Sequence, residues 1–173
     1  LHLVTLSRLV PHKRIEEAID AVAGMDGAVL DVVGSGWWED QLREYAAPHG
    51  DKVVFHGHVS EAYKHALLER AAVHLLPSRK EGWGIAVIEA AQHGVPTVAY
   101  ASAGGVADSI RDGETGRLVQ PGEEFGQVVG ETLGRREAMA PAARKWAARF
   151  SWEETGRRFA TIIGAPKLAQ SSS

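Results

Sequence analysis

The sequence holds 173 residues, of which 45% are hydrophobic and 24% charged, with a net charge of −3 and no cysteine. These values indicate one globular domain with its own core and exclude a disulfide-stapled fold, a thiolate metal site and a chain built mainly to coat nucleic acid. No apolar run is long enough to span a membrane and no signal peptide is visible, so we expect a cytoplasmic protein.

Short apolar segments alternate with amphipathic segments along the chain. Strands are predicted at residues 1–6, 28–33, 53–55, 73–76, 97–100 and 116–119. Helices are predicted at about 15–22, 39–47, 60–72, 84–94 and 105–111, and only helix is expected after residue 119. This alternation predicts an α/β, Rossmann-like doubly wound parallel sheet of about six strands, in the order 3-2-1-4-5-6, with helices on both faces.

Three local features refine the helix predictions. Ser60 is expected to cap the third helix, and Gly94, before Pro96, is expected to end the fourth. The inner face of the third helix is predicted to carry Tyr63, Ala66 and Leu67.

The predicted strand order places a crevice between the carboxyl ends of the first and fourth strands, where the winding reverses and ligands bind. The loop after the first strand carries Arg8 and Lys13, which are predicted to be the only two cations near this crevice. The loop after the fourth strand carries the segment from Glu81 to Glu89. Cations and carboxylates are therefore expected to face one another there.

The chemistry of these residues suits a phosphorylated sugar compound. A guanidinium and an ammonium on a proline-containing loop can hold a diphosphate, although Arg8 and Lys13 read alone are also consistent with ordinary surface cations. Glu89 can accept both hydroxyls of a ribose, and the alternative is an exposed helical glutamate. Glu81 precedes a helix and can equally serve only to complement the helix dipole.

The glycines between the two carboxylates can let a ligand approach the backbone. Gly82 and Gly84 flank Trp83, whose ring is consistent with either a lid or a packing residue. The backbone N–H groups at such a helix start attract anions.

Other motifs are weaker. Gly34-Ser35-Gly36 lacks the third glycine of a dinucleotide fingerprint. His56 and His58 have no further ligands around them, so a metal site is disfavoured. The pair Trp37-Trp38 is interpreted as packing at a helix start, with an interdomain surface as the alternative.

Taken with these placements, the sequence from about residue 3 to residue 163 resembles the C-terminal, donor-binding half of a family 4 (group 1) retaining glycosyltransferase of the GT-B fold. Glu81 and Glu89 match the Glu-x7-Glu hallmark, and Ser7-Arg8-Leu9 with Lys13 resembles the Gly-Arg-Leu…Lys loop, with serine in place of the first glycine. Further matching segments, in the family's order, are 54–59, 103–106, 112–119 and 150–154.

The resemblance implies a role for each site residue. Arg8, Lys13 and Glu81 are the implied catalytic residues: the two cations would neutralise the leaving diphosphate, and Glu81 would orient the donor sugar. Glu89 would hold the ribose hydroxyls. The remaining donor-binding residues would be the helix-start segment Gly82, Trp83, Gly84 and Ile85, and, beside the nucleobase, Gly57, Val59 and Lys64.

The resemblance also implies partners and limits. The donor would be a UDP-, GDP- or ADP-sugar, with no metal or other cofactor required and no nucleic-acid partner. Residues 1–165 would form the donor-binding domain and 166–173 a flexible tail. The N-terminal, acceptor-binding half would be missing, so the fragment alone would be inactive, and any peripheral membrane contact would come through that absent half. The alternatives are a non-catalytic nucleotide-binding or regulatory module and a sugar-nucleotide epimerase, the latter disfavoured by the Glu81–Glu89 spacing.

Overall fold

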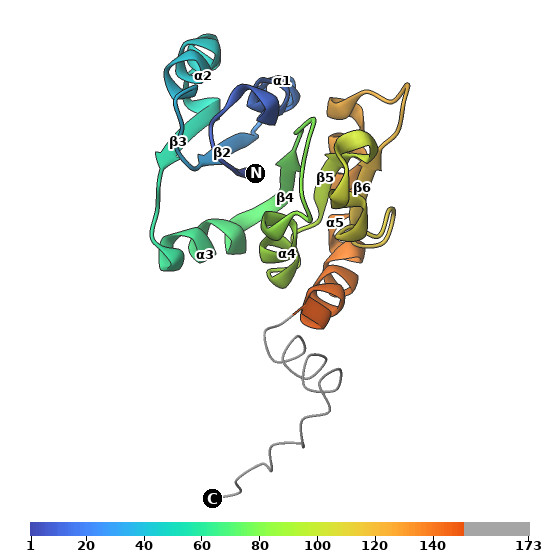
Figure 1. Cartoon of the computed structure of the whole chain (residues 1–173). Coiled ribbons are helices and arrows are strands. Elements are labelled where there is room, and N and C mark those ends of the chain that lie inside the picture. Colours follow the sequence, from blue (N-terminus) through green and yellow to red (C-terminus); the bar gives the residue numbers. More distant parts are fainter. Residues whose placement is uncertain (151–173) are drawn as a thin grey trace, which may run out of the picture.

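One parallel sheet organises the molecule (Figure 1). The computed structural model describes residues 1–150. Its six strands lie in the order β3-β2-β1-β4-β5-β6, which confirms the predicted topology. Neighbouring strands pair in parallel throughout. The strands are β1 (His2–Leu6), β2 (Val29–Val33), β3 (Val53–Gly57), β4 (Ala71–Leu76), β5 (Thr97–Tyr100) and β6 (Gly116–Val119).

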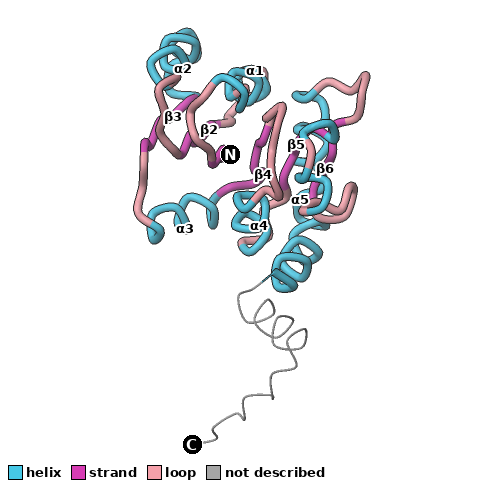
Figure 2. The backbone as a smooth tube through the Cα atoms, in the orientation of Figure 1, coloured by secondary structure: helices cyan, strands magenta, loops and turns pink. Residues whose placement is uncertain are grey.

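Helices lie on both sides of the strands, as Figure 2 shows. The α-helices are α1 (Ile15–Ala23), α2 (Glu39–Ala46), α3 (Glu61–Arg70), α4 (Ile85–Gln92) and α5 (Phe125–Ala147). The 3₁₀ turns are η1 (Pro11–Lys13), η2 (Ala47–Lys52), η3 (Ala101–Ala103), η4 (Gly105–Asp108) and η5 (Ala148–Phe150). The helix predicted at 105–111 is therefore only a 3₁₀ turn, because the glycines at its start permit a tighter path than an α-helix takes.

The alternation of side chains along each strand sends them into two cores. On one face, Leu3, Leu30 and Leu75 pack with buried residues of α1, α2 and α5. On the other face, residues such as Val4 and Val33 pack with α3 and α4. Burying apolar side chains on both faces is the main stabilising term for a parallel sheet of this kind.

Helix α3 differs from the prediction. It ends at Arg70, and β4 begins at Ala71 rather than at residue 73. Leu67 is buried as predicted, but Tyr63 and Ala66 are exposed. The inner stripe runs instead through Leu67, Leu68 and the half-buried Lys64, because these positions share one helix face.

Both predicted helix ends are confirmed. The Ser60 hydroxyl accepts a hydrogen bond from the Tyr63 N–H at 3.2 Å, so it caps α3. Gly94 follows α4 with a φ of 74°, the left-handed conformation that glycine adopts without strain.

Helix α5 fixes the position of α4. It has 23 residues, contains Pro141, and packs Ala143 and Ala147 against Ile88 and Ala91 of α4. This contact holds the helix that carries Glu89 against the rest of the domain. Within residues 1–150, none of the helices has the length and apolar content needed to cross a membrane. The predicted tail at 166–173 lies outside the described residues, and so does the matching segment 150–154 beyond its first residue.

Candidate functional site

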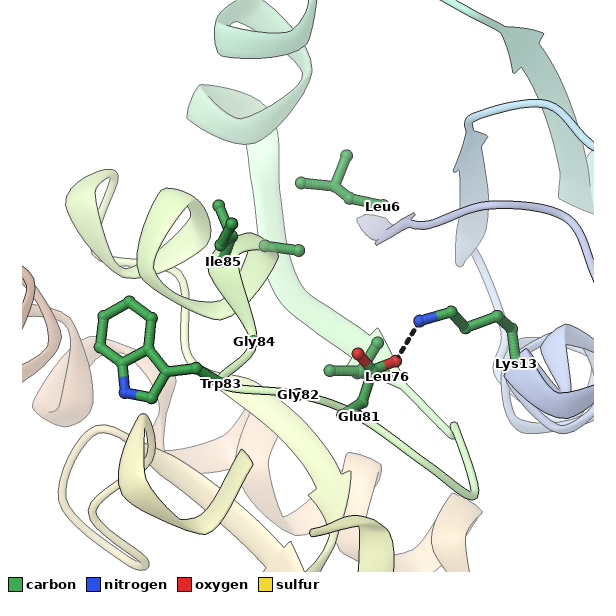
Figure 3. Close-up of a pocket in the computed structure, with 9 residues that line it drawn as sticks. Leu6, Lys13, Leu76, Glu81, Gly82, Trp83, Gly84 and Ile85 are labelled. Carbon is green, nitrogen blue, oxygen red and sulfur yellow. Dashed lines mark hydrogen bonds and ion pairs between the residues drawn. The ribbon is translucent and has the colours of Figure 1, made fainter. Parts of the chain in front are cut away.

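The loops that follow β1 and β4 meet at the carboxyl edge of the sheet, where the crevice was predicted (Figure 3). The Arg79 N–H donates to the His12 carbonyl at 3.0 Å, and the Ser78 hydroxyl contacts the same carbonyl at 3.4 Å. Across this junction the Lys13 ammonium donates to Glu81 Oε1 at 2.5 Å. Both side chains are largely buried, at 17% and 11% exposure. One predicted cation and one predicted carboxylate therefore form a direct ion pair.

An open pocket of about 310 Å³ lies beside this ion pair. Its volume falls at the lower end of the range usual for small-molecule sites. The lining combines one cation, one carboxylate, apolar side chains and exposed backbone: Leu6, Lys13, Leu76, Glu81, Gly82, Trp83, Gly84, Ile85 and Ala86.

The start of α4 opens into the pocket. Gly84 precedes the helix with φ 80° and ψ 61°, a conformation in which glycine is strongly favoured. No side chain caps this end, and the N–H groups of Ile85 and Ala86 find no acceptor within residues 1–150. A helix start of this kind, with free N–H groups and the positive end of the dipole, attracts an anion.

A second glycine pair, Gly104-Gly105, supports the Glu81 loop. The Glu81 N–H donates to the Ala103 carbonyl at 2.7 Å. A Cβ on Gly105 would lie 2.7 Å from the carbonyl oxygen of Gly82, so only glycine lets the two backbones pack this closely. Residues 103–106, which resemble a family motif, thus pack against the loop that carries Glu81 and support its backbone.

Arg8 lies on an exposed part of the loop after β1, and its side chain forms no ion pair within the described part of the chain. The backbone of this loop is fixed, because the Leu9 N–H donates to the Ser35 carbonyl at 3.0 Å. A Cβ on Gly34 or Gly36 would collide with the carbonyl oxygens of Ser7 and Leu9. In the sequence these glycines form only a partial motif, and their supporting role depends on the pairing of β1 with β2.

Trp83 faces away from the Lys13–Glu81 pair in Figure 3. Its ring makes an edge-to-face contact with Phe150, with ring centroids 4.8 Å apart, and it remains 41% exposed. Of the two roles considered from the sequence, this geometry favours packing over a lid.

Glu89 and Lys64 form a second ion pair, which lies outside the pocket lining. The Lys64 ammonium donates to Glu89 Oε1 at 2.5 Å. Of the two cations predicted near the crevice, Lys13 lines the pocket and Arg8 does not, and Lys64 lies against Glu89 outside the lining. The family resemblance implied a donor-binding role for Lys64, and in the structure it occupies a position on the inner stripe of α3, facing Glu89.

Glu89 is placed one helical turn from the pocket. It follows Ile85 by four residues and Ala86 by three, so all three lie on the same side of α4. One turn corresponds to a rise of about 5.4 Å. When the anionic group of a ligand lies at the start of α4, the part of the ligand next to that group can extend one turn along the helix and contact Glu89.

The residues predicted beside the nucleobase follow β3. Gly57 adopts a φ of 67°, and its carbonyl accepts from the Gly34 N–H at 2.9 Å. Val59 is half-buried against the core beneath α3 and α4. Both lie outside the pocket lining, and no contact tests their predicted role.

The weaker motifs have structural roles. His56 contacts the buried carboxylate of Asp31 at 2.7 Å. Within residues 1–150, no group of three or more His, Asp or Glu side chains has the geometry to hold a metal ion. Trp38 packs on the core and donates to Glu16 at 2.7 Å, which confirms packing for this residue, whereas Trp37 is 69% exposed.

Comparison with known proteins identifies relatives of the chain. The family model described as "Glycosyl transferases group 1" matches residues 2–146. A GDP-mannose-dependent alpha-(1-6)-phosphatidylinositol monomannoside mannosyltransferase of Mycobacterium tuberculosis is 33% identical over 188 residues, which cover 97% of this chain and 48% of the relative. The chain thus spans about half the length of the curated relatives that it matches.

Solved structures share the fold. The pneumococcal O-GlcNAc transferase GtfA, in complex with UDP and GlcNAc, superposes with a TM-score of 0.79 at 25% identity over 94% of this chain and 35% of that one. Anabaena Alr3699/HepE, in complex with UDP, gives a TM-score of 0.80 at 23% identity over 95% of this chain and 49% of that one, which is evidence for the fold alone.

Proposed function

Because the chain belongs to the group 1 glycosyltransferase family, we propose that it forms the part of a retaining hexosyltransferase that binds a nucleotide-diphosphate-sugar donor. The main observation in support of this proposal is that the Lys13 loop and the start of α4 line the same pocket. That meeting places a cation and free backbone N–H groups where an anionic ligand can use both.

In this proposal the donor diphosphate occupies the start of α4. Its oxygens accept hydrogen bonds from the N–H groups of Ile85 and Ala86 and contact the Lys13 ammonium. Arg8 adds a guanidinium, which suits a phosphate group through bidentate contacts. The nucleoside then extends one turn along α4, where Glu89 accepts hydrogen bonds from the ribose hydroxyls.

Glu81 faces the sugar end of the donor. When the bond between the anomeric carbon and the diphosphate oxygen breaks, its electron pair goes to the departing diphosphate. Lys13, Arg8 and the start of α4 stabilise that growing negative charge, and the Glu81 carboxylate orients the sugar, which becomes oxocarbenium-like. In this proposal these groups supply the positive charge that faces the leaving group, and no metal ion is included.

The acceptor would bind elsewhere. The matched relatives are about twice as long as this chain. We therefore propose that a further domain supplies the acceptor site and that residues 1–173 alone bind the donor without transferring sugar. Sugar transfer by the purified chain would contradict this part of the proposal.

Isothermal titration calorimetry with GDP, UDP and ADP tests donor binding. GDP is the first choice because the mannosyltransferase relative is GDP-mannose-dependent. Failure of a folded chain to bind any of the three nucleotides would favour a non-catalytic module over the donor-binding role.

The variant Arg8→Ala tests the phosphate contact. It should weaken diphosphate binding by about tenfold or more, because a charge-assisted hydrogen bond contributes on the order of 1.5–3 kcal/mol, while binding of the free nucleoside changes little. The matched control Arg135→Ala, on the exposed face of α5, should change neither affinity. Equal losses for nucleotide and nucleoside in Arg8→Ala would show that Arg8 does not hold phosphate.

A further inference from the structure

Lys64 connects helix α3 to helix α4. Its ammonium donates to Glu89 Oε1 on α4 at 2.5 Å and to Glu61 Oε1 on its own helix at 3.0 Å. The Lys64 side chain is only 16% exposed, and the Glu89 side chain is 28% exposed, whereas Glu61 is open to solvent at 77%. The contact with Glu89 is therefore the sheltered one, and water screens it less than a surface ion pair.

The ion pair constrains one half of the Glu89 carboxylate. Oε1 is engaged by Lys64, and Oε2 has no hydrogen-bond partner within residues 1–150. The contact with Lys64 restrains the Glu89 carboxylate, and its second oxygen keeps its acceptor capacity. Glu89 is therefore held by Lys64 through Oε1 and can still accept a hydrogen bond from a ligand through Oε2.

The ammonium remains charged in this setting. Partial burial acts to lower the pKa of Lys64, but the hydrogen bonds to Glu89 and Glu61 outweigh it, so the pKa lies above its ordinary value. The charged ammonium therefore stays opposite the Glu89 carboxylate as its ion-pair partner.

Helix α3 does not depend on Lys64 for its position. Leu67 and Leu68 are fully buried against the sheet, and Ser60 caps the helix. His65 and His93 make a separate contact between α3 and the end of α4, with ring nitrogens 2.8 Å apart. Removing the Lys64 charge should thus affect the orientation of Glu89 without undocking the helix.

We propose that Lys64 is a positioning residue that holds Glu89 in the orientation needed to recognise the ribose 2′- and 3′-hydroxyls of the donor nucleotide. This inference rests on the proposed donor-binding function and adds to it a residue that acts through Glu89. It differs from the role beside the nucleobase that family resemblance implies for Lys64. Its consequence is specific, because Lys64 then controls the discrimination between a ribonucleotide and its 2′-deoxy counterpart.

The variant Lys64→Met tests this inference, since it removes the charge and retains much of the aliphatic stem. The dissociation constants of GDP, UDP and ADP are measured by calorimetry, each beside its 2′-deoxy form. The wild-type chain should prefer the ribonucleotide by about tenfold, because one charge-assisted hydrogen bond is lost with the 2′-hydroxyl. In Lys64→Met this preference should fall to about threefold or less.

The ratio of the two constants separates positioning from other effects. A general loss of positive charge, or a small loss of stability, weakens both nucleotides equally and leaves the ratio unchanged. Lys64→Arg should restore most of the preference because it returns a cation to the pair. Glu61→Gln, which removes only the exposed partner of Lys64, is the control and should keep the wild-type ratio.

The possible outcomes separate the role of Lys64 from donor binding. An unchanged or larger ratio in Lys64→Met, with the thermal melting temperature preserved, would overturn the role of Lys64 while leaving donor binding intact. A wild-type chain that binds ribonucleotide and 2′-deoxynucleotide equally would show that Glu89 does not read the 2′-hydroxyl and would overturn the inference. A folded wild-type chain that binds none of the nucleotides would overturn the proposed function and the inference together.

Discussion

Lys13 and Glu81, 68 residues apart in the sequence, share a hydrogen-bonded ion pair of 2.5 Å at the edge of the pocket. In the proposed complex both groups also contact the donor: Lys13 the diphosphate and Glu81 the sugar. The carboxylate therefore competes with the diphosphate for the same ammonium, and a donor that carries a sugar gives Glu81 a new partner.

The first prediction follows from this competition. Glu81→Gln removes the negative charge beside the phosphate site. GDP should therefore bind to this variant about threefold more tightly than to the wild-type chain, and in any case no more weakly. GDP-mannose should bind more weakly than to the wild-type chain, because the carboxylate proposed to orient the sugar is gone. Calorimetry with both ligands checks this, with Glu44→Gln on the exposed side of α2 as the control. A parallel loss for GDP and GDP-mannose would contradict the division of roles.

Gly84 gives the second prediction. Its left-handed φ of 80° disfavours any L side chain, and an added Cβ would lie 3.0 Å from Ser109 Oγ and 3.1 Å from Val87 Cγ2. Gly84→Ala should lower the free energy of unfolding by about 1–3 kcal/mol. Gly82→Ala is the matched control, since a Cβ there meets nothing within 4 Å. Urea denaturation of both variants provides the measurement, and equal stability for the two would argue against strain at Gly84.

The third prediction concerns Asp31, a carboxylate with no solvent exposure at the centre of β2. It contacts His2 at 2.8 Å on β1, His56 at 2.7 Å on β3 and Arg70 at 2.7 Å on α3. Asp31→Asn should lower the free energy of unfolding by about 1–3 kcal/mol, because the buried amide accepts fewer hydrogen bonds from these partners and turns its own N–H group toward them. The exposed Asp26→Asn serves as the control in the same denaturation experiment. A loss no larger than that of the control would show that the cluster is energetically neutral.

The fourth prediction is a pH dependence set by His74. Complete burial lowers the pKa of His74 from 6.5 to about 3, and the ring contacts the Thr97 hydroxyl at 3.0 Å through Nδ1. The folded state therefore keeps His74 neutral at pH values where the unfolded chain binds a proton. Its contribution to stability is fully present above pH 6.5 and is lost as the pH falls from there toward about 3.

Denaturation across this range measures the effect. Wild-type stability should fall more steeply with decreasing pH than that of His74→Gln, by at most about 1.4 kcal/mol per pH unit between roughly pH 6 and pH 4. The exposed His58→Gln should keep the wild-type slope. Identical slopes for wild type and His74→Gln would show that His74 binds its proton as readily in the folded state as in the unfolded chain and would contradict the lowered pKa.

Most of the fold was predictable because the strands are short apolar runs and the helices between them are amphipathic. The strand order and the crevice followed from that alternation, and so did the meeting of the Lys13 and Glu81 loops. The inner face of α3 was not predictable in the same way. Periodicity did not place Lys64 on that face, and its pairing with the carboxylate on α4 is known only from the structure.

Local conformation and close backbone packing were also beyond the sequence pattern. Gly34 and Gly36 look like an incomplete motif until β1 and β2 pair and bring the Ser7–Leu9 backbone against them. Trp83 allowed two interpretations because its contact with Phe150 joins residues far apart in the chain.

The sequence by itself determined the doubly wound sheet, the position of the candidate site and the residue types that form it, since periodicity and local turn chemistry act over short stretches of chain. Only the tertiary structure decided which charges pair: Lys13 with Glu81, and Lys64 with Glu89. Ion pairing depends on distances of a few ångströms between separate elements, and those distances are set by how the helices pack on the sheet.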